Sequence, residues 1–131
     1  MRLLLDTHIW VWSLTEPDKL GARVRRALQD PGNELWLSPL SIWELLVLTE
    51  KRRIVLDRDV TDWVAQASTD LPTNEAPLTH EVALETRNFR LPHADPVDKL
   101  LAATARAFHL TLVTADKRLI GLKGVRVFAN R

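Results

Sequence analysis

The sequence predicts an α/β fold in which a mostly parallel sheet of four to five short strands lies between two layers of helices. Three observations predict it. Short apolar segments of strand length recur along the chain, stretches with apolar residues at helical spacing separate them, and serine–proline and aspartate–proline pairs mark helix starts. Parallel strands require helical crossovers and are buried on both faces, which accounts for their apolar sequences.

The elements follow one another with short turns between them, and no repeat, linker or low-complexity segment interrupts them. Strands are expected over residues 2–6, 34–37, 75–78, 110–114 and 125–128, and helices over 8–14, about 20–28, 39–52, 60–67, 80–88 and 96–108.

Three of the helices have recognisable start signals. Thr7 is expected to cap the first helix, because a hydroxyl before the helix can accept a free backbone N–H. Ser38-Pro39 and Asp95-Pro96 each combine a capping side chain with proline at the first helical position. Thr7 and Ser38 directly follow expected strands, so the helices that they begin should start at the edge of the sheet.

Composition limits the class of protein. The 131 residues fit a single domain spanning 1–131, large enough to bury a core without a structural metal. No cysteine is present, which excludes disulfides, thiolate zinc sites and cysteine nucleophiles and suits a cytoplasmic location. The net charge of +1 gives no global basic field, and no apolar run has the length of a membrane helix or signal peptide.

Two aspartates follow strands at what should be the same edge of the sheet. Asp6 ends the first strand, and Asp116 lies two residues beyond the expected strand that ends at Thr114. In parallel sheets, reactive groups gather beyond the carboxyl ends of the strands. Each residue alone is equally compatible with a turn or capping role, so the argument depends on further acids.

Glu44 and Asp98 are the further acids. Glu44 is the only charge in the helical segment IWELLVL, so its carboxylate lies inside the apolar stripe or at its edge, reaching water. Asp98 is the third residue of its helix, where it could support the helix dipole or a capping box. It nevertheless shares a helix face with small apolar residues that should pack on the sheet, so we expect it to point inward while Asp95 caps.

Four carboxylates brought together repel one another unless a cation binds them. With oxygen ligands only, the cation is expected to be Mg²⁺ or Mn²⁺ rather than zinc. Such an ion activates water and stabilises charge on a phosphate, which is the chemistry of phosphodiester hydrolysis. The four histidines, at positions 8, 80, 93 and 109, show no metal-ligand spacing; His8 could reach the site, although a packed or solvated role is the simpler interpretation.

Four motifs occur in order over essentially the whole chain: LLLDTHIW (residues 3–10), SPLSIWEL (38–45), HADPVDKLLAATA (93–105) and LVTADKRL (112–119). Together they resemble the VapC family of PIN-domain ribonucleases. The resemblance implies a PIN-like fold, with Asp6, Glu44, Asp98 and Asp116 as catalytic acids and metal ligands and with Thr7 and Thr114 as supporting hydroxyls. Lys99 stands where the family often has arginine.

The resemblance also implies a biological role: the toxin of a type II toxin–antitoxin system, acting as an endoribonuclease on an RNA substrate. Its partners would be a second copy in a homodimer and a cognate antitoxin, with DNA bound only through the antitoxin. Trp10, Trp12 and Trp43 lie on the helices nearest the acids and suit antitoxin binding, although at least one is expected in the core. Possible phosphate contacts are Lys99, Lys117 and Arg118.

Three other classes of protein were compared with this interpretation. A phosphoacceptor receiver domain gathers acids at a sheet edge but does not ordinarily place an essential acid inside a helix, as Glu44 is here. A haloacid-dehalogenase-type phosphatase requires a second aspartate two residues after the first, and that position is His8. A non-catalytic PIN-like binding module stays the alternative, although all four acids are intact.

Overall fold

A five-stranded parallel sheet forms the centre of the molecule. The computed structural model describes residues 1–91 and 95–131. The sheet order is β3-β2-β1-β4-β5, and every neighbouring pair is parallel. The strands are β1 (Arg2–Leu5), β2 (Glu34–Leu37), β3 (Asn74–Glu75), β4 (Thr111–Thr114) and β5 (Arg126–Ala129).

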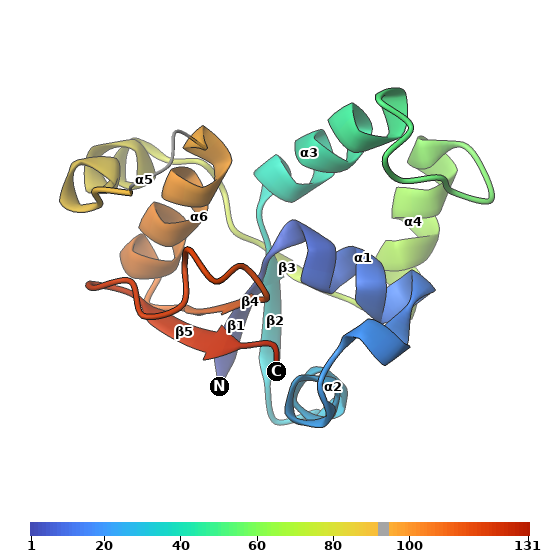
Figure 1. Cartoon of the computed structure of the whole chain (residues 1–131), viewed down its shortest axis with the longest axis horizontal. Coiled ribbons are helices and arrows are strands. Elements are labelled where there is room, and N and C mark those ends of the chain that lie inside the picture. Colours follow the sequence, from blue (N-terminus) through green and yellow to red (C-terminus); the bar gives the residue numbers. More distant parts are fainter. Residues whose placement is uncertain (92–94) are drawn as a thin grey trace.

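Helices connect β1 to β2, β2 to β3 and β3 to β4, and they cover both faces of the sheet, whereas turns connect β4 to β5 (Figure 1). One group contains the helices that follow β1 and β2, and the other lies on the opposite side (Figure 1). The α-helices are α1 (Thr7–Thr15), α2 (Ala22–Gln29), α3 (Pro39–Glu50), α4 (Val60–Asp70), α5 (His80–Glu85) and α6 (Pro96–Ala107), with 3-10 turns η1 (Pro17–Lys19) and η2 (Thr86–Asn88).

Alternation along the strands explains the three layers. In β1, Leu3 and Leu5 belong to a core cluster with residues of α1, α2 and α4, whereas Leu4 belongs to a second cluster with residues of α6. In β4, Val113 joins the first cluster and Leu112 the second. Successive side chains of a strand point to opposite faces, so β1 and β4 each contribute to both cores.

The order in which the chain adds strands to the sheet reverses at β1, although all the strands are parallel. From β1 the chain runs through α1 and α2 to β2 on one side, and it returns much later to β4 on the other side. The carboxyl ends of β1, β2 and β4 therefore meet around one crevice, which is where open α/β sheets bind ligands.

The predicted fold class is confirmed, with two local corrections. Thr7 is not the cap of α1: it is the first helical residue, and the carboxylate of Asp6 accepts the Thr7 N–H instead. The strand expected over residues 75–78 is β3, two residues long, which ends before Pro77 because proline cannot donate to a strand ladder. No helix in the described part of the chain is both long and apolar enough to cross a membrane.

Candidate active site: an acidic pocket at the carboxyl edge of the sheet

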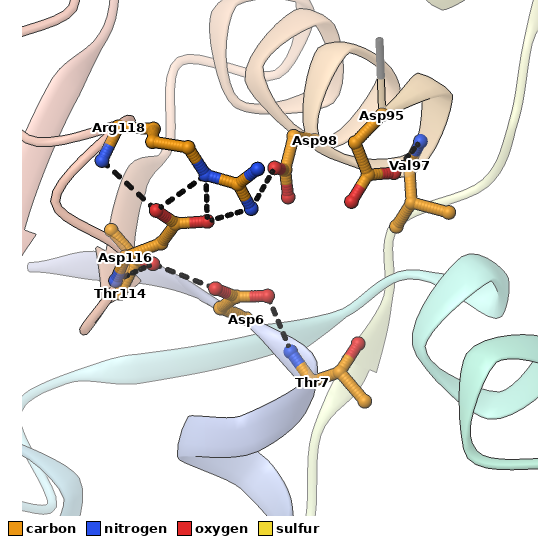
Figure 2. A network of polar contacts seen from close by, with 8 residues as sticks. All are labelled: Asp6, Thr7, Asp95, Val97, Asp98, Thr114, Asp116 and Arg118. Atoms are coloured by element: carbon orange, nitrogen blue, oxygen red, sulfur yellow. Dashed lines mark hydrogen bonds and ion pairs between the residues drawn. The ribbon is translucent and has the colours of Figure 1, made fainter. Parts of the chain in front are cut away.

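A pocket of about 300 Å³ opens at this crevice and is lined by five carboxylates. They come from the end of β1, from α3, from the start of α6 and from the turn after β4, so chain segments far apart in sequence meet here. Figure 2 shows Asp6, Asp95, Asp98 and Asp116. The structure thus brings together all four acids expected at the sheet edge and adds a fifth. The lining residues are Asp6, His8, Trp12, Glu44, Asp95, Asp98, Ala115, Asp116 and Arg118.

Asp6 and Asp98 are the two buried acids of the pocket. The Asp6 side chain is 9% exposed and caps α1, with Oδ1 accepting the backbone N–H of Thr7 at 2.8 Å. Its Oδ2 atom accepts a 2.6 Å hydrogen bond from the Thr114 hydroxyl. Burial raises the pKa of Asp6, and these two hydrogen bonds oppose that rise only partly. A buried carboxylate with a raised pKa is poised to gain from a nearby cation.

Thr114 connects two of the acids. Its hydroxyl donates to Asp6 and accepts the backbone N–H of Asp116 at 3.0 Å, so one side chain fixes both the end of β1 and the turn after β4 (Figure 2). The hydroxyl is fully buried, which prevents water from replacing either bond. Thr114, expected as a supporting hydroxyl, thus contacts both Asp6 and Asp116.

Glu44 reaches the pocket from α3, which begins directly after β2. Ser38 caps this helix by accepting the Leu40 N–H at 3.1 Å. Ser41, one turn before Glu44, accepts a 3.0 Å hydrogen bond from the Thr7 hydroxyl, which ties α3 to α1. Burial raises the pKa of Glu44, and the nearby Thr7 side chain opposes that rise only partly. The half-buried carboxylate lies at the edge of the apolar stripe, facing the pocket.

Asp98 points inward from the first turn of α6, as its helix position predicted. It is 6% exposed, on the same side as the buried Leu101 and Ala102. Asp95 caps the helix, with Oδ1 accepting the Val97 N–H at 3.0 Å, and it also lines the pocket. Sequence reasoning assigned Asp95 only the capping role, although a cap at a helix start facing the sheet edge necessarily points toward the same space.

Arg118 brings a positive charge to these carboxylates. Its Nη2 atom lies 2.8 Å from Oδ2 of Asp116 and 3.5 Å from Oδ2 of Asp98 (Figure 2). Among the possible phosphate contacts, only Arg118 lines the pocket; Lys117 is exposed and Lys99 is half-buried. The position of Arg118 over two acids had no signal in the sequence, because it depends on the turn that follows β4.

The donor chemistry of the pocket fits a hard divalent cation. Its ligands are carboxylate oxygens, which Mg²⁺ and Mn²⁺ prefer. Within residues 1–91 and 95–131, no three His, Cys, Asp or Glu side chains are grouped closely enough to hold a metal as they stand. The guanidinium of Arg118 lies between Asp98 and Asp116 and contacts both carboxylates.

The aromatic and histidine residues divide among core, pocket and surface. Trp10 is buried, Trp12 lines the pocket, and Trp43 is 54% exposed. His8 is exposed, as a solvated histidine would be, and it also lines the pocket. His93, part of one motif, lies outside the described residues.

The sequence of the chain matches a known family. Residues 3–124 match the PIN domain, and the chain belongs to that family. Over 120 residues it is 34% identical to Ribonuclease VapC22 of Mycobacterium tuberculosis, a match that covers 89% of this chain and 88% of that protein. The resemblance to VapC-type PIN domains is therefore confirmed.

Solved structures show the same fold. VapBC2 from Rickettsia felis, bound to a promoter DNA fragment, matches with a TM-score of 0.75 at 18% identity, covering 100% of both chains. DNA-bound VapBC from Salmonella typhimurium matches with a TM-score of 0.71 at 16% identity over 98% of both chains. At such identities the likeness establishes the PIN-domain fold alone.

Proposed function

We propose that this chain is a metal-dependent endoribonuclease and the toxin of a type II toxin–antitoxin system. The observation that carries the proposal is the convergence of five carboxylates from four chain segments on one pocket in a PIN domain. A structural role would not require so many acids at one place, because like charges destabilise one another at short range.

The proposed metal ligands are Asp6, Glu44 and Asp98, with Asp116 completing the site directly or through water. The bound ion, Mg²⁺ or Mn²⁺, would supply an activated water and offset charge on the phosphate. Asp6 is held in one orientation by Thr7 and Thr114, and this fixed geometry favours binding because little conformational freedom is left to lose. Arg118, once displaced from the acids, is within reach of a phosphate bound at the pocket.

The proposed partners follow from the relatives. The ribonuclease name of the mycobacterial relative supports RNA as the substrate. The two VapBC structures, each bound to DNA, support a cognate antitoxin as the partner of this chain. We propose that the chain is brought to DNA only through that antitoxin. We further propose a homodimer, a single PIN domain over residues 1–131, and a cytoplasmic location where RNA and antitoxin are found.

The decisive experiment is cleavage of cellular RNA by the purified chain with Mg²⁺ or Mn²⁺, with EDTA, and with the Glu44→Gln variant. We expect cut RNA only in the wild-type sample with metal, and sequencing of the new ends would identify the target. If the folded protein binds RNA but never cuts it, the chain is a binding module. We expect the cognate antitoxin to be a small protein encoded beside the gene for this chain. If adding that protein fails to block cleavage, the toxin role is wrong while the nuclease role stands.

A further inference from the structure

We propose that a second hollow beside the acidic pocket binds the RNA nucleotide adjoining the scissile phosphate. This inference rests on the proposed function and names the substrate contact that the acids themselves cannot make. We call this hollow the Trp12 groove and define it by His8, Trp12, Lys19 and Arg53.

The Trp12 groove and the acidic pocket are neighbours. Both are lined by His8 and Trp12, which lie one turn apart on the same face of α1. The groove has a volume of about 600 Å³, enough for a nucleotide. An RNA strand with one phosphate in the acidic pocket would therefore place its next nucleotide in the groove.

The two hollows differ in charge. The acidic pocket has five carboxylates against Arg118, whereas the groove has two permanent cations, Lys19 and Arg53, and a single carboxylate, Glu16. That carboxylate is already paired with Lys19 at 3.2 Å. The groove is thus unsuited to a metal and suited to a phosphate, next to a pocket with the opposite preference.

The wall shared by the two hollows is aromatic. The rings of His8 and Trp12 lie 5.5 Å apart, inclined at 56°. His8 is exposed and Trp12 is partly exposed, so both present ring surface to the hollow. Single-stranded RNA bases stack on aromatic faces regardless of their identity. The ammonium of Lys19, 5.4 Å from the Trp12 ring centroid, is on a flexible stem and can move to a phosphate when a base takes its place.

Arg53 is the second cation. It follows the end of α3, where its backbone N–H is bonded to the carbonyl of Leu48 at 2.9 Å. Its exposed guanidinium forms no hydrogen bond or ion pair with any described residue. An arginine whose backbone is anchored and whose charge is unpaired is well placed to contact a phosphate.

Binding of short single-stranded RNA in EDTA tests the groove without requiring cleavage. The probe is a fluorescently labelled RNA oligonucleotide of mixed sequence, and the readout is anisotropy. Trp12→Leu should weaken binding about 5- to 100-fold, the loss expected for one base stack. Trp12→Phe should retain most of the affinity, because it keeps a ring. Trp43→Leu removes an exposed tryptophan outside both hollows and should change little.

Salt dependence tests the cations. Arg53→Gln should reduce the slope of log affinity against log salt by about 0.7, the value for one phosphate contact on a single strand. Arg25→Gln is the matched control, an exposed arginine on α2 outside the groove, and should leave the slope unchanged. If the Trp12→Leu and Arg53→Gln proteins, shown to be folded by circular dichroism, bind RNA as wild type does, the proposal is wrong.

The two proposals fail in different ways. Binding that depends on Trp12 without any cleavage in Mg²⁺ or Mn²⁺ would support the groove and overturn the nuclease. Cleavage that is lost in Glu44→Gln, combined with an RNA affinity that is unchanged in Trp12→Leu, would support the nuclease and overturn the groove. If the groove variants lose only the affinity for a purified antitoxin, the surface binds protein and the nucleotide assignment is overturned.

Discussion

The guanidinium of Arg118 donates two hydrogen bonds to the carboxylate of Asp116, from Nη2 to Oδ2 at 2.8 Å and from Nε to Oδ1 at 3.1 Å. The backbone N–H of Arg118 also donates to Asp116 Oδ1 at 2.9 Å, so the turn after β4 is built around this pair. Because Nη2 also lies 3.5 Å from Asp98, the positive charge of Arg118 already contacts two of the proposed metal ligands, Asp98 and Asp116. A divalent ion must therefore compete with Arg118.

Arg118→Gln should bind Mn²⁺ more tightly than wild type. The arginine side chain is half-exposed, so water screens its ion pairs and the gain in Mn²⁺ affinity should be small, about 1.5- to 5-fold. Calorimetric titration with Mn²⁺ would measure the difference, and Lys117→Gln, an exposed neighbour, is the control. Equal affinities for wild type and Arg118→Gln would mean that the guanidinium does not compete with the ion.

The proposed ligands should be individually essential. Asp6→Asn, Glu44→Gln and Asp98→Asn should each reduce RNA cleavage by more than about 100-fold, because even changes in groups that only support metal ligands cost about 10–100-fold. Each variant should remain folded, and each should relieve growth inhibition when expressed in cells. Cleavage at the wild-type rate in all three variants would overturn the assignment of the site.

Thr114→Val should impair the site without removing a ligand. The replacement has nearly the same shape but lacks the hydroxyl that donates to Asp6 and accepts from Asp116. We expect cleavage to fall about 10–100-fold and stability to fall by about 1–3 kcal/mol, the cost of leaving buried polar groups unpaired. Thr111→Val, at the partly buried start of the same strand, is the control. Unchanged cleavage in Thr114→Val would mean that the hydroxyl does not position Asp6.

The features that sequence predicted correctly are those set by short-range rules. Ser38-Pro39 and Asp95-Pro96 begin helices as expected, since a capping side chain and its N–H partner are two residues apart. Asp6 also lies at its expected sheet edge, because any residue directly after a parallel strand must lie there. Its capping of α1 in place of Thr7 is a shift of one residue, within the freedom of helix ends.

The features that sequence missed depend on side chains meeting over long separations. Arg118 contacts Asp98 across 20 positions, and no local pattern predicts that meeting. Likewise, the Trp12 groove requires residues after α3 to approach α1, which only the packed fold provides. Asp95 was assigned one role because capping explained it fully, although its carboxylate also lines the pocket.

The metal-free protein should lose stability as the pH rises from the acidic range. Burial raises the pKa values of Asp6 and Glu44, so in the folded state they hold protons that the unfolded chain has already released. Between the unfolded and the higher folded pKa of each group, the native state binds more protons, and stability falls with increasing pH. Thermal scans in EDTA across this range would show the melting temperature decreasing toward neutral pH.

Asp6→Asn removes one of these buried charges, so it should raise the melting temperature of the metal-free protein at neutral pH by a few degrees. The difference from wild type should shrink at acidic pH, where Asp6 is protonated. Mn²⁺ should then stabilise wild type more than the variant, because the ion binds only the folded site and loses a ligand in Asp6→Asn. Asp95→Asn is the contrast: asparagine caps nearly as well, so only the charge at the helix start is lost, about 0.3–1 kcal/mol. If Mn²⁺ shifts wild type and Asp6→Asn equally, Asp6 is a helix cap and not a ligand.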